Sequence, residues 1–274
     1  MSHSPGENHA AIKALVQAQF APAAQAYVSS ATHAYGADLA RLVALAAPRG
    51  HECVLDVATG GGHTALAFAP HVRQVIASDL TLAMLYAARA HLAAAGVRNV
   101  SYLRAEAERL PIAPASLDLI TCRVAAHHFA DVRAFVHGAA AALRPGGRLL
   151  ISDHIGSADP ELDAFMDRFE RWRDPSHVRA YSYAEWQAFC AAAGLRLVHH
   201  EDDPREPYNF AEWTARSHMP PAERTGLERW LLDAEARLRE HFAIVEQAGR
   251  VVSLRGSFGI IVAQKAERRP VEPG

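Results

Sequence analysis

Cysteine is scarce in this sequence, and its spacing excludes a metal or redox pair. The three cysteines are Cys53, Cys122 and Cys190, and no two of them form a Cys-x-x-Cys motif. Cys53 and Cys122 fall in apolar, strand-like runs, where a buried thiol acts as a small hydrophobic group. An odd number of cysteines without an evident pairing favours a reducing compartment, so we expect a cytoplasmic protein.

Long apolar segments and strongly charged segments are also missing. No apolar run approaches the roughly 18–20 residues that a membrane span requires. Residues 1–6 lack the basic start and the apolar stretch of a signal peptide. The formal net charge is −2, and the clustered basic pair Arg268-Arg269 stands in a Pro-containing tail. We therefore expect no membrane span and no nucleic-acid partner.

What the sequence does contain is an alternation of short apolar runs and longer helical stretches. We expect strands at the apolar runs, which are residues 53–57, 75–78, 100–103, 117–122 and 148–152. Ala-rich segments with helical character lie between them, notably 81–95 and 131–143. Strands that alternate with helices at this spacing favour right-handed βαβ units and a parallel sheet covered on both faces.

Both ends of the chain have helical apolar spacing. Residues 8–48 are expected to form helices that break near Pro22 and Gly36. In the second half we expect helices at 160–173 and 183–192, a strand at 195–200, a helical stretch at 210–243 interrupted by Pro220-Pro221, and a last strand at 257–264.

Three consecutive glycines form the strongest local motif. The segment leads from a strand into a helix and reads Asp56-Val57-Ala58-Thr59-Gly60-Gly61-Gly62-His63. Glycine tolerates positive φ and lets a ligand lie against bare backbone, and the first turn of the following helix offers free N–H groups. A plain turn between strand and helix is the alternative, although such a turn needs only one glycine. We interpret the segment as a ligand-binding loop.

An acidic residue closes the next strand. Asp79 stands 17 residues after Gly62, and its carboxylate can accept both hydroxyls of a ribose. In doubly wound sheets, ligands bind beyond the carboxyl ends of the strands, so the loop and Asp79 should be neighbours. The alternative is that Asp79 caps the helix that begins at Thr81. Beside the glycine loop, ribose binding is the interpretation that we prefer.

The glycine loop and Asp79 are compatible with two nucleotide cofactors. The segment from Gly60 to Ala65 also fits the Gly-x-Gly-x-x-Ala pattern of dinucleotide-binding folds, and Asp79 lies near the position of the ribose acid in that pattern. The glycines alone do not decide between NAD and S-adenosylmethionine (SAM).

Five segments in order resemble the motifs of class I SAM-dependent methyltransferases, in particular the ubiquinone/menaquinone-biosynthesis (methyltransferase type 11) group. They are Asp56 to His63, Asp79, Ala105 to Pro111, Leu117 to Arg123 with the following Ala125 to Phe129, and Leu143 to Leu149. Each segment is weak alone, whereas all five in order at suitable spacing are specific. The resemblance covers about residues 25–200 and, more weakly, the end of the chain.

The resemblance implies an α/β fold with a Rossmann-like, doubly wound sheet of seven strands, mostly parallel with an antiparallel last strand. N-terminal helices and a helical insertion before the last strand complete it. No internal repeat or Gly/Ser/Pro-rich linker divides the chain, so we expect one methyltransferase domain over residues 1–274. Its expected parts are an N-terminal helical cap (1–48), a SAM-binding core (49–205), a helical lid (206–250), a final strand region (251–266) and a tail (267–274).

The resemblance also implies SAM as the cofactor and S-adenosylhomocysteine (SAH) as the product. The positions that match the cofactor-binding motifs are Asp56, Ala58, Gly60, Gly62, Asp79, Leu80, Glu106, Ala107, Arg123 and His33. Asp56 is expected near the amino group of SAM, Asp79 at the ribose and Glu106 at the adenine amino group. Arg123 is expected beside the methionine end through its backbone carbonyl.

Glu106 departs from the family pattern. The family usually has Asp there, preceded by Gly where this chain has Ala105. The longer side chain can still reach an adenine. For Glu108, an exposed acidic helix start is the interpretation that we prefer.

Two histidines are candidates for a general base. His127 and His128 follow the fourth strand at the carboxyl edge of the sheet, and histidine titrates near neutrality. The alternative is that one of them packs under the helix beginning near Asp131. A metal site is not expected, because Asp153 and His154 form the only close Asp/His pair near the expected site and two residues are not a ligand set.

About 50 residues separate the last two strands, where this fold usually has a close hairpin. Aromatic residues and Met occur along this stretch: Tyr208, Phe210, Trp213, Met219 and Trp230. We interpret it as a lid over an apolar acceptor pocket. Packing on the domain, or on a partner subunit in a homodimer, is the alternative.

The sequence therefore predicts a SAM-dependent methyltransferase that acts on a small-molecule acceptor by in-line displacement. The first alternative is an NAD-dependent oxidoreductase, although the Tyr-x-x-x-Lys pair of short-chain dehydrogenases is missing. The second alternative is a SAM-binding protein without catalysis.

Overall fold

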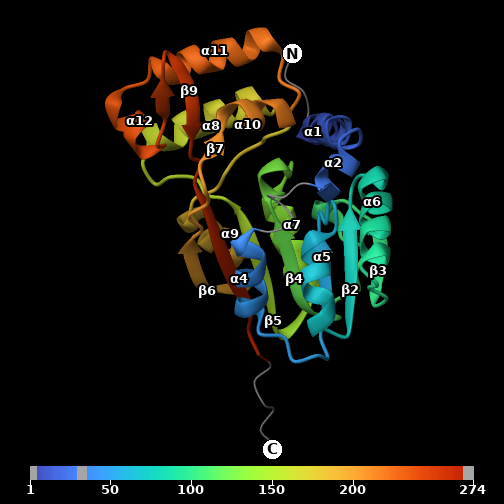
Figure 1. The fold of residues 1–274 in the computed structure, drawn as a ribbon. Coiled ribbons are helices and arrows are strands. Elements are labelled where there is room, and N and C mark those ends of the chain that lie inside the picture. The colour runs from blue at the N-terminus through green and yellow to red at the C-terminus, as the bar shows by residue number, and fades with distance from the viewer. Residues whose placement is uncertain (1–4, 30–35, 268–274) are drawn as a thin grey trace, which may run out of the picture.

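One central sheet organises the molecule. The computed structural model describes residues 5–29 and 36–267. In these residues the main sheet has seven strands in the order β3-β2-β1-β4-β5-β10-β6, and β10 runs antiparallel to both neighbours (Figure 1). The strands are β1 (Cys53–Val57), β2 (Gln74–Asp79), β3 (Val100–Arg104), β4 (Leu117–Arg123), β5 (Leu143–His154), β6 (Leu195–Asp202) and β10 (Phe258–Lys265). The predicted fold class is confirmed.

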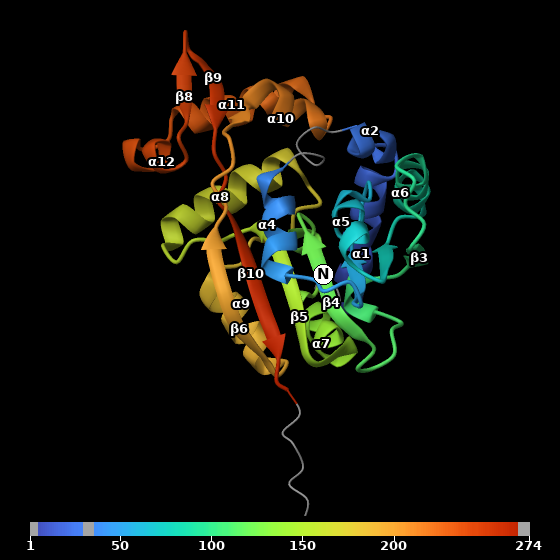
Figure 2. The ribbon, with the colours of Figure 1, turned by 60° about the horizontal axis from the view of Figure 1, so that its bottom comes forward.

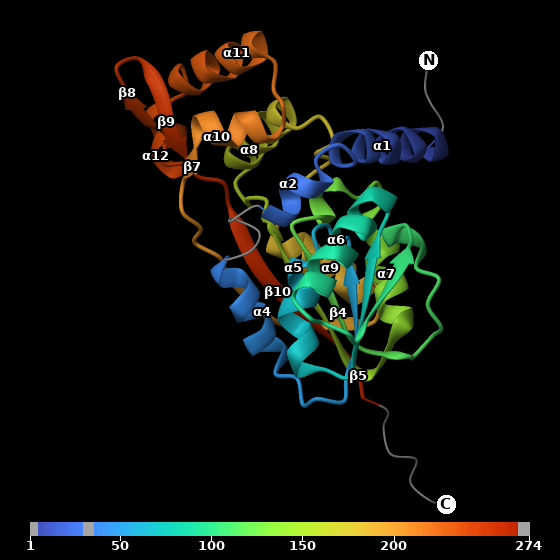
Figure 3. The same cartoon turned by 45° about the vertical axis from the view of Figure 1, so that its right-hand side comes forward.

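Helices cover both faces of this sheet (Figure 3). On one face lie α4 (Ala37–Ala46), α5 (His63–Phe68) and α6 (Leu82–Ala94), and on the other lie α7 (Val132–Ala142) and α9 (Tyr183–Ala192). Neighbouring residues of β1 point to opposite faces, so Val54 packs with Leu42 of α4 and Leu55 packs with Phe135 of α7. Every residue of β1 is buried, as expected of a parallel strand covered twice.

A smaller layer, which we call the cap, lies above the carboxyl edge of the parallel strands (Figures 1 and 2). Its helices are α8 (Pro160–Arg173), α10 (Phe210–Arg216), α11 (Pro221–Leu232) and α12 (Ala236–His241). A small sheet joins them, with the strands β7 (Tyr208–Asn209), β9 (Arg250–Leu254) and β8 (Val245–Gln247) in that order. Large side chains form its core, including Phe165, Phe169, Trp213 and Phe242.

The cap differs in detail from the expected helical lid. Residues 210–243 hold separate helices rather than one interrupted stretch, and short strands flank them. Residues 250–254 belong to the small sheet of the cap and not to the final strand. Strands of two to five residues are too short to show a reliable alternation of apolar and polar residues.

The N-terminal helices α1 (Pro5–Phe20) and α2 (Ala24–Ser29) lie beside the cap over the same edge of the sheet (Figure 3). Phe20 and Ala24 pack against Met84 of α6. The expected breaks near Pro22 and Gly36 fall between helices. His33 and residues 268–274 lie outside the described residues.

Within residues 5–29 and 36–267, no helix combines the length and the apolar character that crossing a membrane requires.

Candidate active site

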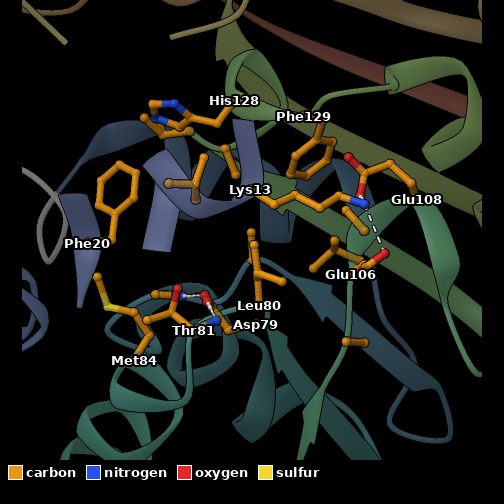
Figure 4. A pocket seen from close by; sticks show the side chains of 18 residues that line it. Lys13, Phe20, Asp79, Leu80, Thr81, Met84, Glu106, Glu108, His128 and Phe129 are labelled. Atoms are coloured by element: carbon orange, nitrogen blue, oxygen red, sulfur yellow. Dashed lines mark hydrogen bonds and ion pairs between the residues drawn. The ribbon is translucent and has the colours of Figure 1, made fainter. Parts of the chain in front are cut away.

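A cavity lies at the carboxyl ends of β1, β2 and β3. Ala58 and Gly60 line it after β1, Asp79 and Leu80 at the end of β2, and residues 105–108 after β3. Side chains from α1 close it on the opposite side (Figure 4). We call it the cofactor cavity.

The glycines of the loop have different tasks. Gly60 has φ +53°, and a Cβ at this position would meet nothing within 4 Å. A ligand can therefore lie against its backbone. Gly62 has φ +83°, and its Cβ would stand 3.1 Å from Ala88 and 3.3 Å from Leu92 of α6. Gly60 thus serves the cavity, whereas Gly62 allows the loop to pack closely on a helix.

Asp79 connects the loop to the next helix. Its Oδ2 accepts the Gly60 N–H at 3.0 Å, and its Oδ1 accepts the Thr81 N–H at 2.8 Å. Burial raises the pKa of this carboxyl, because these hydrogen bonds offset the desolvation only in part. Each oxygen keeps a second lone pair, and the side chain lines the cavity (Figure 4). Asp79 therefore supports the helix start and still presents an acceptor to a ligand.

Asp56 lies behind the cavity wall rather than in it. The side chain is 1% exposed and accepts the hydroxyls of Thr59 at 2.6 Å and Thr121 at 2.9 Å. Burial raises its pKa to about 6, against the opposing effect of these hydrogen bonds. Asp56 holds the loop in shape from below.

Arg123 also points away from the cofactor cavity. Its Nε and Nη2 contact the two carboxylate oxygens of Asp38 on α4, at 2.5 and 2.9 Å. Arg205 Nη2 and Ser152 Oγ bind the same carboxylate at 2.9 and 3.0 Å. Although burial opposes it, pairing with Arg123 and Arg205 holds the pKa of Asp38 below its usual value.

The part of the cavity beyond β3 is closed by an ion pair that the sequence did not suggest. Lys13 of α1 places its Nζ 2.9 Å from Glu106 Oε2 and 3.5 Å from Glu108 Oε2 (Figure 4). The expectation that Glu108 is exposed is wrong. Its side chain is 11% exposed, and it accepts the Ala130 N–H at 3.0 Å.

A second cavity, of about 1070 Å³, lies between the carboxyl edge of the sheet and the cap. Aromatic rings form much of its wall, and Tyr208, Trp213 and Phe258 belong to it. Phe20, Val124 and His128 border both cavities. Val124 has φ +53°, a conformation that β-branched residues rarely adopt and that is frequent at functional sites. We call this meeting point the junction.

His127 forms a dyad with Asp153. His127 Nδ1 lies 2.5 Å from Asp153 Oδ1, and both side chains are almost fully buried. Because a carboxylate only accepts, Nδ1 carries the proton, and in the neutral ring Nε2 is then an acceptor. Burial favours a higher pKa for Asp153, but His127 and the backbone N–H groups of Ala126 and His154 outweigh it and lower the pKa. The imidazole lines the second cavity.

His128 has a different environment at the junction. Its Nδ1 lies 2.9 Å from the carbonyl oxygen of Ser176, so Nδ1 carries the proton and Nε2 is an acceptor. Burial, and secondarily the nearby His127, lower its pKa to about 3. The ring contacts Phe20 edge-on at a centroid distance of 5.0 Å. His128 is therefore a neutral hydrogen-bonding group near neutral pH.

The predicted cofactor residues thus fall into three groups. Six of them line the cofactor cavity: Ala58, Gly60, Asp79, Leu80, Glu106 and Ala107. Three stand behind its wall: Asp56, Gly62 and Arg123. His33 lies outside the described residues.

Sequence reasoning missed two of the partners found here. Lys13 gave no signal, because its role depends on where α1 lies. The pairing of Asp153 with His127 was accessible in principle. β4 and β5 are parallel neighbours with Arg123 opposite Ser152, so the residues that follow them must lie side by side.

Known proteins resemble this chain over most of its length. Residues 55–151 match the family model described as a methyltransferase domain. YcgJ of Bacillus subtilis (strain 168), named an uncharacterized methyltransferase, is 38% identical over 237 residues, which are 85% of this chain and 92% of that protein. The ubiquinone biosynthesis O-methyltransferase of Xylella fastidiosa (strain M23) is 34% identical over 176 residues, 61% of this chain and 70% of that enzyme.

A solved structure agrees with these relatives. The crystal structure of a Bacillus halodurans C-125 protein superposes with a TM-score of 0.82 at 37% identity, covering 84% of this chain and all of that one. The seven-stranded sheet with its antiparallel last strand, and the glycine loop after β1, match what the motifs implied. With a methyltransferase relative matched over most of both lengths, the resemblance is confirmed, and the chain belongs to the class I SAM-dependent methyltransferase family.

Proposed function

We propose that this chain transfers a methyl group from SAM to a small-molecule acceptor and releases SAH. The observation that carries the proposal is the junction. Val124 and His128 border both cavities, so a donor in the cofactor cavity would meet an acceptor in the second cavity there. A protein that only binds SAM needs no second cavity at this point.

The cofactor cavity fits the adenosyl group in its chemistry. The free lone pairs of Asp79 can accept the two ribose hydroxyls. The open space at Gly60 allows a ligand to lie against the loop. Glu106 and Ala107 line the part of the cavity beyond β3, where Glu106 can accept from an adenine amino group.

When bound, SAM supplies an electrophilic methyl group on a sulfonium sulfur. The task of the protein is to align an acceptor atom with that carbon and to exclude water. Correct orientation of two reactants can lower a barrier by roughly 7–11 kcal/mol. Phe20 and Val124 offer apolar surface at the junction, which suits both tasks.

We assign the general base to His127. Its Nε2 can take a proton from an acceptor hydroxyl or similar group, while Asp153 at 2.5 Å orients the ring and stabilises the charge that it gains. Asp153 is thus a positioning residue. His128 is the poorer base, because burial lowers its pKa to about 3, and we assign it a hydrogen bond to the acceptor at the junction.

Calorimetry with SAM, SAH and NAD tests the cofactor assignment. Binding of SAH without binding of NAD supports it, and binding of NAD without SAH contradicts it. Incubation with methyl-labelled SAM and a metabolite extract then tests transfer. A labelled product together with SAH supports the proposal, whereas SAH binding with no turnover would leave a SAM-binding protein without catalysis.

A further inference from the structure

Aromatic rings and guanidinium groups alternate along the wall of the second cavity. The guanidinium carbon of Arg205 lies 3.9 Å from the ring centre of Phe258, and that of Arg173 lies 5.1 Å from a ring of Trp213. Tyr208 stacks on Trp213 with a centroid distance of 5.3 Å and an interplanar angle of 7°. Such a wall brings aromatic side chains and positive charge together.

Positive groups outnumber negative groups on this wall. Of the described residues, Arg173, Arg205 and Arg216 line the second cavity, whereas Asp174 is the only carboxylate among the lining side chains. The carboxylates that pair with Arg205 belong to residues outside the lining. Asp174 itself stands 3.6 Å from Arg173 Nη2, so the described lining carries more positive than negative side chains.

Several buried polar atoms at this end of the cavity have no hydrogen-bond partner. Arg173 Nε is one, and it stands 3.6 Å from Glu170 Oε2, beyond hydrogen-bond distance. His154 Nδ1 is another; this side chain is 5% exposed and lines the cavity. His154 Nδ1 stands 3.7 Å from Glu170 Oε1, and both Oε atoms of Glu170 are unpartnered as well. Buried polar groups are nearly always paired in native proteins, so this cluster of Arg173, His154 and Glu170 is short of hydrogen bonds.

The unpartnered atoms of Arg173 and His154 need a hydrogen-bond acceptor. The guanidinium of Arg173 can only donate. Burial is the main reason why the pKa of His154 lies well below its usual value, so its ring is neutral and keeps one N–H to donate. An oxyanion that entered from the cavity could accept from Arg173 and His154, the two members of this cluster that line it.

We propose that the acceptor is an aromatic acid, with its planar ring against the aromatic wall and its carboxylate or phosphate group bound by Arg173 and Arg205. This inference rests on the proposed function, because it places the methylated atom of the same molecule at the junction near His127. It names the class of acceptor that the second cavity takes.

Three small probes test the proposal in the full-length chain saturated with SAH: benzoate, phenyl phosphate and benzamide. The first two carry an oxyanion, and the third is a neutral compound of similar shape. Because hydrogen bonds to a charged group are the stronger ones, calorimetry should show at least one anion binding about ten- to a hundredfold tighter than benzamide. The tighter of the two anions distinguishes a carboxylate from a phosphate acceptor. Equal binding of all three, or no binding of either anion, would overturn the proposal.

Substitutions in α8 test whether Arg173 is responsible for the preference for an anion. Arg173→Gln should reduce the preference for the anion to within about threefold, and Arg173→Lys should retain part of it because the charge remains. The matched control is Arg168→Gln on the same helix, since Arg168 stacks on Trp230 at 4.7 Å and does not line the cavity. A preference that survives in Arg173→Gln would show that the arginine only holds the cap in place.

Two readouts keep this inference separate from the proposed function. Calorimetry with SAH reports on the cofactor cavity. If the wild-type chain does not bind SAH, that result contradicts the proposed function alone. The comparison of benzoate with benzamide can then be made without SAH. Thermal unfolding of each variant shows whether it is folded, and Arg173→Lys serves as the test if Arg173→Gln is not.

Discussion

Asp79 satisfies two backbone N–H groups and still faces a ligand cavity. Replacing it with alanine removes the acceptor that we assign to the ribose hydroxyls. We expect Asp79→Ala to weaken SAH binding by at least about tenfold, the equivalent of one charge-assisted hydrogen bond. Calorimetry measures the change, and circular dichroism checks that the loop variant is folded. Asp118→Ala, at an acid that pairs with Arg144 away from the cavity, is the control. An unchanged dissociation constant would sink the ribose assignment.

The dyad predicts a different signature for His127. Removing a general base lowers turnover by roughly 10²–10⁴ and leaves the cofactor cavity intact. With an acceptor identified by SAH release, His127→Ala should therefore lower kcat by about that factor while the dissociation constant of SAH stays within about twofold. A larger loss in His128→Ala than in His127→Ala would transfer the role to His128.

Asp153→Asn tests whether the charge of Asp153 affects His127 or whether Asp153 only holds the turn after β4. The Oδ2 of Asp153 accepts backbone N–H groups of residues 125–127, and asparagine keeps an oxygen for them. The variant should be folded, yet the pH profile of turnover should shift because the charge beside His127 is gone. A profile identical to that of the wild type would mean that Asp153 only caps the turn after β4.

Asp56 predicts a pH dependence of stability. Burial raises its pKa from 3.8 to about 6, so the folded protein binds this proton more tightly than the unfolded chain does. The stability from the protonated form is complete below about pH 4 and is lost as the pH rises through about 6. The free energy of unfolding of the wild type minus that of Asp56→Asn should therefore fall by about 2 kcal/mol from about pH 4 to about pH 7. Urea titrations measure it, and parallel curves would contradict the shift.

At the residue scale, the sequence revealed what local motifs encode. Gly60 and Asp79 stand next to a strand end, and their neighbours in the chain are enough to identify them. Lys13, Asp153 and Arg173 act through residues 26 or more positions away or through a wall that only the folded chain assembles. No local pattern marks such residues, because their function depends on tertiary placement.

At the scale of the element, α1 forms one wall of the cofactor cavity, and the charge of Lys13 helps to hold this helix against the cavity. Lys13 is one of two lysines in the chain, and it contacts both Glu106 and Glu108. Partly exposed ion pairs of this kind contribute up to about 1 kcal/mol each. We expect Lys13→Ala to raise the hydrogen exchange of the α1 amides about three- to tenfold, the factor that this energy gives.

Matched controls make the α1 experiment decisive. Lys13→Arg keeps the charge and should leave exchange close to the wild type. The amides of β1 should be unaffected in both variants, because every residue of β1 is buried in the sheet. Equal exchange in Lys13→Ala and wild type would show that apolar contacts alone, such as that of Phe20 with Met84, hold the helix.

The helices and strands differed in how well the sequence predicted them. The main strands of the core were recognisable because apolar runs of four to six residues alternate with helices there. The short strands β7, β8 and β9 were not, since their pairing comes from the cap and not from their own pattern. α9 shows the opposite case, because a capping box of Ser182 and Glu185 fixes its start locally.

At the scale of the whole molecule, one buried carboxylate links the N-terminal helices, the sheet and the approach to the cap. Asp38 on α4 binds Arg123 at the end of β4, Ser152 in β5 and Arg205, which precedes β7. Removing one partner of a buried ion pair typically costs about 3–5 kcal/mol, so Asp38→Ala should destabilise the fold by that amount. Asp167→Ala, which breaks an exposed pair with Arg171, should cost at most about 1 kcal/mol. Urea denaturation compares them, and equal losses would contradict a linking role for Asp38.

Phe20 ends a 16-residue helix and belongs to the wall of both cavities. The two cavities therefore have one side chain of this helix in common. If donor and acceptor bind as we propose, a change at Phe20 should alter the binding of both ligands and not of one alone.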